Sequence, residues 1–285
     1  MTDLKAWWSL LSDAASGWMS HRASTLGAAV AFYSVFSIGP LLLIAISIAG
    51  LFFGHDAVRG EVSAQLSRLL GTQGAQGVES MLSGVGRFSE GIFATLLGVA
   101  TLLFAAVGVV VQLKDALNAI WGVEQPKTSG IWNFMRTYAV SIAGVLSLGF
   151  LLLVSLLITT ALSAMGGTLA NYLPEVVFHT VSFSVSFCVN ALLFAMMFKW
   201  LPDIQIDWKD VTPGALVTAA LFDIGRLMIG LYIGKQGLES TYGAAASLVI
   251  VLIWVYYSAQ IVLFGAELTR AYVQRGSGSI IPSQR

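Results

Sequence analysis

The fold class follows from residues 242–270, which read YGAAASLVIVLIWVYYSAQIVLFGAELTR. The 21 residues from Ala244 to Phe264 carry no formal charge. As a helix they would extend roughly 31 Å, which matches the ~30 Å hydrocarbon core of a lipid bilayer. Tyrosine stands at one end of the stretch, and Glu267 and Arg270 stand at the other, as interfacial anchors do. The stretch therefore predicts a transmembrane helix.

The composition of the whole chain agrees with a membrane protein. Hydrophobic residues make up 56% of the 285 residues and charged residues only 11%, against roughly 25% charged in soluble domains. The net charge is zero, so no electrostatic footprint for nucleic acid is present and we expect no nucleic-acid partner. The single cysteine, Cys188, excludes an intrachain disulfide and a thiol metal cluster.

Six apolar runs are long enough to span a bilayer. Only helices and closed barrels satisfy their backbone groups in lipid, and these runs lack the strict alternation of a barrel. We therefore predict an all-α membrane protein, a six-transmembrane-helix bundle with an N-terminal interfacial amphipathic helix. The predicted spans are residues 28–53, 91–111, 137–163, 177–198, 211–233 and 243–266.

The segments outside the spans complete the predicted organisation. Residues 1–24 form an amphipathic helix with three tryptophans on its apolar side, suited either to a membrane interface or to packing on the protein's own cytoplasmic end. Residues 25–270 form the membrane domain, and residues 271–285 are predicted to be a flexible cytoplasmic tail. The outer loop 54–90 is predicted to hold two short amphipathic helices separated by glycines, as a lid or as a partner surface.

The positive-inside rule gives the orientation. With the N-terminus in the cytoplasm, ten Lys and Arg residues fall on the inside and four on the outside, and Arg226 falls within a span. We therefore expect a multi-pass protein of the bacterial inner (plasma) membrane with both termini in the cytoplasm.

Asp223 and Arg226 are the charged residues expected near the middle of a bilayer. They lie three positions apart, so they share one face of the predicted helix 211–233. A charge at that depth costs ~2.5 kcal/mol or more, so it is usually paired or faces a cavity. One interpretation is a polar site on a substrate path, in which Arg226 binds an anionic group such as a phosphate. The other is a self-neutralising pair that fixes helix packing.

Two further residues extend the substrate-path hypothesis. Pro40 lies inside the first predicted span, where it removes one backbone hydrogen bond and is expected to kink the helix. Transporters often build sites from such broken helices, although proline also occurs in ordinary spans. Asn190 lies at middle depth in the fourth predicted span, where it can line a cavity or bond between helices.

A second set of polar residues is predicted at the cytoplasmic side. Asp115, Asn118 and Glu267 come to a similar depth, and the small residues before Glu267 allow close helix approach. The set forms either a cytoplasmic gate or an ordinary interfacial hydrogen-bond network.

The sequence gives no sign of catalytic or metal chemistry. The three histidines are scattered without metal-ligand spacing, and neither a P-loop nor a GxSxG motif is present. We therefore expect no enzyme activity, no catalytic residues, no metal and no cofactor. Oligomeric state cannot be inferred from these features.

Five stretches make the chain similar to the YihY/BrkB family of bacterial inner-membrane proteins, over residues 22–273. They are AFYSVFSIGPLLL (31–43), LKDALNAIWGV (113–123), FLLLVSLLIT (150–159), LPDIQIDWKDVTPGALVTAALF (201–222) and YGAAASLVIVLIWVYYSAQIVLFGAELT (242–269). The resemblance implies six spans and cytoplasmic termini. The family has carried the label ribonuclease BN, but this chain has no basic groove and no metal cluster for such chemistry.

These features favour a transporter or flippase of an anionic lipid or a small envelope metabolite. The lipid bilayer and an anionic lipid or small anionic metabolite are the expected partners. The alternative is a non-transporting scaffold in an envelope-biogenesis complex, which would use loop 54–90 and the N-terminal helix as contact surfaces.

Overall fold

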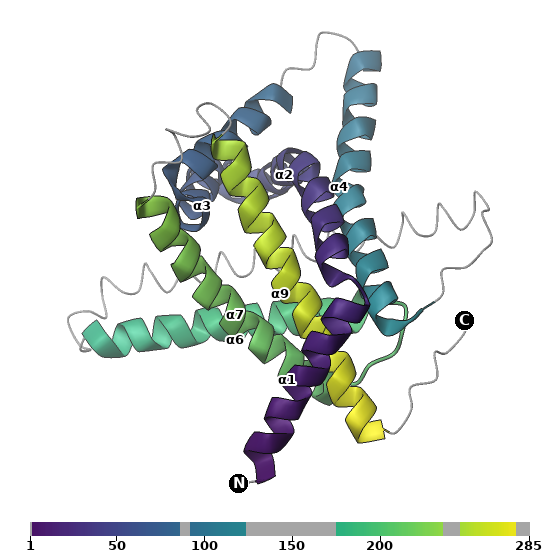
Figure 1. Cartoon of the computed structure of the whole chain (residues 1–285). Coiled ribbons are helices and arrows are strands. Elements are labelled where there is room, and N and C mark those ends of the chain that lie inside the picture. The colour runs from purple at the N-terminus through teal and green to yellow at the C-terminus, as the bar shows by residue number, and fades with distance from the viewer. Residues whose placement is uncertain (1, 86–91, 124–174, 236–245, 278–285) are drawn as a thin grey trace.

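Helix α9 (Ala246–Ser277) lies at the centre of the arrangement (Figure 1). The structure is a computed structural model that describes residues 2–85, 92–123, 175–235 and 246–277. α9 packs against α1, α2, α3, α4 and α7, so the stretch from which the fold class was predicted also organises the packing. The other helices are α1 (Thr2–Ser20), α2 (Ala23–Phe53), α3 (His55–Val85), α4 (Ile92–Trp121), α6 (Glu175–Trp200) and α7 (Trp208–Lys235).

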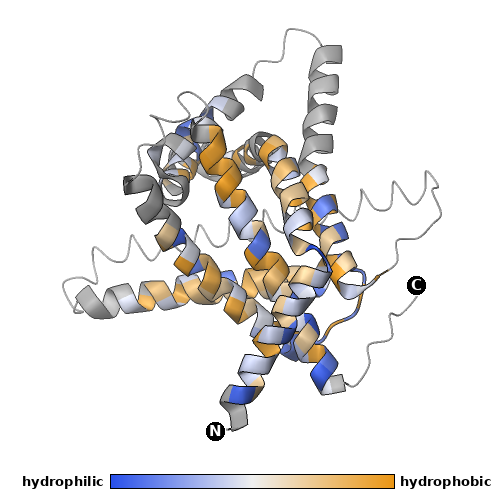
Figure 2. Cartoon of the chain, in the orientation of Figure 1, coloured by the Kyte–Doolittle hydropathy of each residue, from blue (hydrophilic) through white to orange (hydrophobic). Residues whose placement is uncertain are grey.

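Three of the described helices are long and apolar enough to cross a membrane. The qualifying segments are Phe183–Trp200 in α6, Trp208–Met228 in α7 and Leu248–Gly276 in α9. They coincide with the fourth, fifth and sixth predicted spans, and Figure 2 shows hydrophobic residues along all three helices. The first and second predicted spans fall in α2 and α4, and the third, residues 137–163, lies outside the described residues.

The largest apolar cluster lies at the end of the bundle where α1 meets the last part of α9, which we call the terminal end. The start of α2, the ends of α4 and α6, the start of α7 and the second half of α9 all contribute buried side chains. Leu117 of α4, Phe198 of α6 and Leu263 of α9 are almost completely buried there. Packing between five helices therefore fixes this end.

α7 and α9 cross through two matching Gly-x-x-x-Thr segments. Gly214 and Thr218 of α7 face Gly265 and Thr269 of α9, and each threonine hydroxyl donates to the carbonyl oxygen of its own glycine, at 2.7 and 2.9 Å. A Cβ at Gly214 would lie 2.6 Å from the Gly265 carbonyl oxygen. The absence of side chains at both glycines thus allows the two backbones to approach closely.

α1 docks on α9 through a stripe that lies beside the apolar side predicted from the sequence and shares part of it. Leu10 and Ala14 of α1 pack against Leu268 and Ala271 of α9. On the apolar side predicted from the sequence, Trp8 is 75% exposed, whereas Trp18 packs against the largest apolar cluster and Leu11 against the contact with α9. Both predicted uses of this helix therefore remain open, because packing on the protein and an exposed aromatic face coexist.

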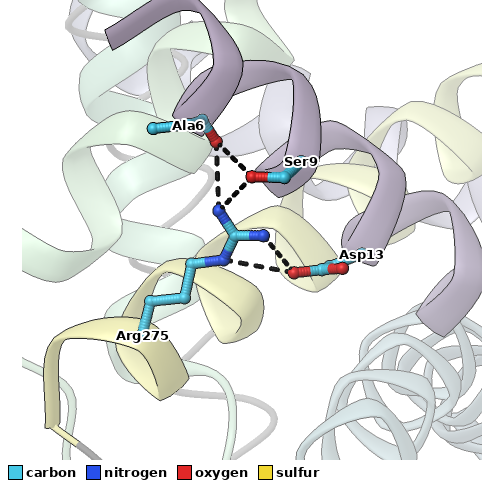
Figure 3. A network of polar contacts seen from close by, with 4 residues as sticks. All are labelled: Ala6, Ser9, Asp13 and Arg275. Carbon is cyan, nitrogen blue, oxygen red and sulfur yellow. Dashed lines mark hydrogen bonds and ion pairs between the residues drawn. The ribbon is translucent and has the colours of Figure 1, made fainter. Parts of the chain in front are cut away.

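Arg275 joins α1 and α9 near their ends (Figure 3). Its guanidinium pairs with the Asp13 carboxylate and donates hydrogen bonds to Ser9 Oγ at 2.8 Å and to the Ala6 carbonyl oxygen at 3.0 Å. α9 extends to Ser277. The part of the predicted flexible tail that is described, residues 271–277, is therefore helical and in contact with α1.

α3 is one element where the sequence predicts two helices. It runs from His55 to Val85 through the glycines expected to break it. Arg59 and Glu79 nevertheless line the same small pocket, although a straight helix would hold residues that far apart in sequence ~30 Å from each other. The predicted break is thus a bend within α3. Its Val58 and Val78 belong to an apolar cluster with Val251 and Trp254 of α9, so α3 packs on the bundle.

Candidate functional site

Asn190, Asp223 and Arg226 come together between α6 and α7. The Asn190 amide donates to Asp223 Oδ1 at 3.4 Å, and Arg226 Nη2 lies 3.9 Å from the same oxygen. Asp223 is 7% exposed, whereas the Arg226 side chain is 39% exposed. Within the described part of the chain, the contact of the Arg226 guanidinium is this ion pair, which is too long for a hydrogen bond. Its N–H donors are therefore available to another group.

The position of Arg226 on α7 matters because the helix is a candidate span. Ile224 and Met228 are exposed apolar residues. Each lies two positions from Arg226, roughly 200° around the helix. Asp223 lies on the Arg226 side and is buried. Arg226 therefore occupies the opposite side of α7 from this apolar stripe, where a charge in a membrane protein is expected.

Aromatic side chains surround this turn of α7. Phe222 makes edge contacts with Phe194 of α6 and Trp254 of α9, at centroid distances of 5.7 and 5.6 Å. The Tyr257 hydroxyl of α9 donates to the Leu221 carbonyl oxygen at 3.3 Å, and Gly225 leaves the space that the tyrosine ring fills. α9 thereby holds the turn that carries Asp223 and Arg226.

Pro40, the remaining residue of the substrate-path hypothesis, belongs to α2. The helix continues past it to Phe53 and changes direction along its length (Figure 1). The side chain of Pro40 is not among those described, so its predicted place beside the polar residues stays a prediction.

The residues of the predicted cytoplasmic gate bind different partners. Asn118 of α4 forms two hydrogen bonds with Asp203, one to its carboxylate at 2.9 Å and one from its backbone N–H at 2.8 Å. Lys114 Nζ lies 2.9 Å from the same carboxylate. The connection between α6 and α7 is therefore bound to the end of α4.

Asp115 lies beside this fastening. Burial raises the pKa of its carboxyl group, the neighbouring Lys114 ammonium opposes that shift, and the charge of Asp203 adds to it. An ionised Asp115 thus costs free energy in the folded chain, since burial is the largest effect.

Glu267, the third residue of the predicted gate, binds His21, which sequence reasoning missed. His21 Nδ1 lies 2.6 Å from Glu267 Oε1, and Arg270 Nη1 lies 2.8 Å from His21 Nε2. Glu267 is 2% exposed, and Gly17 of α1 leaves the space for its carboxylate. Arg22, with φ of 54°, turns the chain from α1 into α2 and leaves His21 at the junction.

These arrangements contain charged clusters but no metal centre. No group of three or more His, Cys, Asp or Glu side chains able to hold a metal ion occurs among the described residues.

The helical architecture and the three helices long and apolar enough to cross a membrane are those of a multi-pass helical membrane protein. The profile of the family described as Virulence factor BrkB matches residues 14–283, and the chain belongs to this family, the YihY/BrkB family of bacterial membrane proteins. The resemblance seen in the sequence is thereby confirmed.

Curated relatives are distant and longer. A UPF0761 membrane protein of Pseudomonas paraeruginosa is 28% identical over 251 residues, which cover 88% of this chain and 59% of the relative. Similar proteins occur in a Psychrobacter species, 24% identical over 97% of this chain and 50% of the relative, and in Pseudoalteromonas translucida, 26% identical over 84% and 78%. The chain thus spans about three fifths of the first relative's length. No solved structure matches it.

Proposed function

We propose that this protein is a transporter or flippase that moves an anionic lipid or a small anionic envelope metabolite across the bacterial inner membrane. The observation that carries the proposal is the Arg226 guanidinium, which lies inside a candidate span and faces away from the apolar stripe of α7. Among the residues that the structure describes, its one charged partner is Asp223, at 3.9 Å. Family membership and the membrane setting support it, and the names of the relatives assign no substrate.

The geometry suggests how an anion would bind. Arg226 has five N–H donors in a planar fork, which suits a phosphate or a carboxylate. Asp223 neutralises part of the guanidinium charge at 3.9 Å, a distance too long for a hydrogen bond. An incoming anion can therefore take the guanidinium donors, while Asn190 continues to hold Asp223. The binding is reversible and involves no covalent chemistry, so we propose no enzyme activity.

The proposal includes the complete topology. Six spans with both termini in the cytoplasm would place the terminal end on the cytoplasmic side and α3 on the outer side. The excess of positive residues in the predicted inside segments supports this orientation.

Reconstituted vesicles provide the test. Wild-type protein in proteoliposomes should move fluorescent phosphatidylglycerol between leaflets, scored by dithionite quenching, or take up radiolabelled inorganic phosphate. Arg226→Gln should slow the movement by about tenfold or more, because a hydrogen bond to a charged group is worth ~1.5–3 kcal/mol. Arg226→Lys should retain part of the rate, since it keeps the charge but loses the fork.

The matched control is Lys209→Gln, which neutralises an exposed cation outside this site. It should leave the rate unchanged. Equal rates for wild type and a folded Arg226→Gln variant would show that Arg226 is not on the substrate path.

A scaffold function is the second candidate, and the exposed tryptophan-bearing side of α1 favours it. It predicts that an Arg226→Gln variant supports envelope integrity in a deletion strain as well as wild type does. Under the transport proposal the same variant would fail this complementation.

A further inference from the structure

We propose that Lys199, Trp200 and Trp208 bind the headgroup of a phospholipid in the leaflet next to the terminal end. One segment long and apolar enough to cross a membrane ends at Trp200, and the next begins at Trp208. The ends of such segments lie at the level of the lipid headgroups. The site does not depend on the transport proposal, because a lipid bound there need not be moved.

The two tryptophans form an exposed aromatic surface where α6 ends and α7 begins. Trp200 is 61% exposed and Trp208 is 44% exposed. Their ring centroids lie 5.7 Å apart, and the ring planes are nearly perpendicular. In a membrane interface such rings contact the apolar part of a lipid, while the indole N–H remains among polar groups. The pair therefore suits the region where the acyl chains join the headgroup.

The polar groups on this surface are hydrogen-bond donors. Lys199 Nζ lies 5.4 Å from the centroid of the Trp208 ring and donates a hydrogen bond to the Ile206 carbonyl oxygen at 2.6 Å. An ammonium has three N–H donors and an indole has one, and neither group accepts. Among the described residues the two indoles have no acceptor, and two donors of Lys199 remain unused. A phosphodiester with ester carbonyls beside it supplies the acceptor oxygens that this set requires.

The nearby carboxylates are engaged by other cations. Lys114 lies 2.9 Å from Asp203, and Lys209 lies 3.6 Å from Asp207. Within the described ranges, Lys199 has no ion pair. Its positive charge is therefore available to the negative charge of a phosphate.

Contacts with the bundle fix this surface from its inner side. Asn118 of α4 forms two hydrogen bonds with Asp203 in the connection between α6 and α7. The side chains of Phe198 and Ile206, on either side of the connection, are 1% and 5% exposed. A lipid headgroup thus meets side chains that are already in place, which lowers the entropic cost of binding.

Fluorine NMR of the full chain, labelled with 5-fluorotryptophan in detergent micelles, tests the site. The two signals are identified by their loss in Trp200→Phe and Trp208→Phe. Phosphatidylglycerol should shift both signals saturably. A galactosyl diacylglycerol with the same acyl chains but no phosphate should bind about tenfold more weakly, because the hydrogen bond to the charged group is lost. Inorganic phosphate at the same concentration should shift neither signal.

Variants of Lys199 test its part in the site. Lys199→Gln should weaken the binding of phosphatidylglycerol by about tenfold, because it removes the charged donor. Lys199→Arg should retain most of the affinity, since it keeps the charge and N–H donors. The matched control is Lys209→Gln, which removes an exposed cation of the same region that faces Asp207. It should leave the affinity unchanged.

Three results would overturn the proposal. Equal affinities for phosphatidylglycerol and the galactolipid would reduce the tryptophans to an unspecific interfacial anchor. Equal shifts with inorganic phosphate would make the site one for a soluble anion, and no shift with either lipid would leave the surface to a protein partner. These comparisons use the wild-type chain, so they decide even if Lys199→Gln does not fold.

Discussion

At Asp115 burial and a neighbouring cation act in opposite directions on one carboxyl group. Burial has the larger effect and raises the pKa above its ordinary value of 3.8. The folded chain then binds the proton more tightly than the unfolded chain, so the free energy of unfolding falls as pH rises from 3.8 through the folded-state pKa. Above that range the cost is fully present.

We therefore expect Asp115→Asn to raise the thermal midpoint at neutral pH. The difference from wild type should shrink as pH falls toward the ordinary value of 3.8, because protonation removes the cost from wild type as well. Thermal unfolding in detergent across a pH series measures both. A lower midpoint at neutral pH would mean that the attraction of Lys114 exceeds the cost of burial.

Residue-level prediction from the sequence works where the partners lie close along the chain. Asp223 and Arg226 are three positions apart, so the periodicity of a helix is enough to pair them. His21 and Glu267 are 246 positions apart, and no periodic signal connects them. The same reason explains why the sequence groups Asn118 with a gate although its partner is Asp203, 85 positions away.

At the scale of elements, the crossing of α7 and α9 depends on two glycines. A Cβ at Gly265 would lie 3.0 Å from Phe198 Cζ and would overlap the Thr218 side chain. Gly214→Ala and Gly265→Ala should each destabilise the fold by about 1–3 kcal/mol, because overpacking forces the helices apart. Denaturation in mixed micelles gives the measurement.

Gly60→Ala is the control for both variants. A Cβ at Gly60, inside α3, would meet no atom within 4 Å. Alanine there should be neutral or stabilise by up to about 1 kcal/mol, because it is the better helix former. Comparable losses at Gly60 and Gly214 would contradict the importance of the close crossing.

The contact between α1 and α9 has an apolar part and an ionic part, and the two contribute different amounts of free energy. Leu10→Ala should cost about 2–4 kcal/mol of docking free energy, because Leu10 is buried against Leu268 and Ala271. Arg275→Gln should cost under about 1 kcal/mol, since Arg275 and Asp13 are exposed and screened by solvent. Hydrogen exchange of the α1 amides should thus rise more in Leu10→Ala. The reverse order would make the ion pair the main attachment.

Hydrophobic patterning predicted α6, α7 and α9 well because each is a long, mostly apolar run bounded by polar residues. It predicted only part of the face by which α1 docks, since Leu11 and Trp18 pack on the bundle while Trp7 and Trp8 are exposed. Leu10 and Ala14, which lie beside the tryptophans, make the buried contact with α9, and Gly17 nearby allows close approach to Glu267. In α3 the glycines mark a bend, since helical hydrogen bonding continues through them.

At the scale of the whole molecule, function depends on the side of the membrane on which each segment lies. If the terminal end is cytoplasmic, the contact of His21 with Glu267 lies on the cytoplasmic side, and Arg226 lies between the two compartments. Three candidate spans are identified in the described residues, whereas six are predicted from all 285 residues. An even number of spans places both termini on the same side of the membrane, and an odd number places them on opposite sides.

Single-cysteine labelling decides between these totals. In a Cys188→Ser background, cysteines are introduced at Ser16 in α1, Gln76 in α3, Thr168 between the third and fourth predicted spans, and Gln274 in α9. Ser16, Gln76 and Gln274 are exposed. A membrane-impermeant maleimide applied to intact spheroplasts should label positions 76 and 168 and should reach 16 and 274 only after lysis, because positive segments stay inside. Labelling of 16 but not 274 in intact cells would require an odd number of spans, and labelling of both would reverse the orientation and place the terminal end on the outer face.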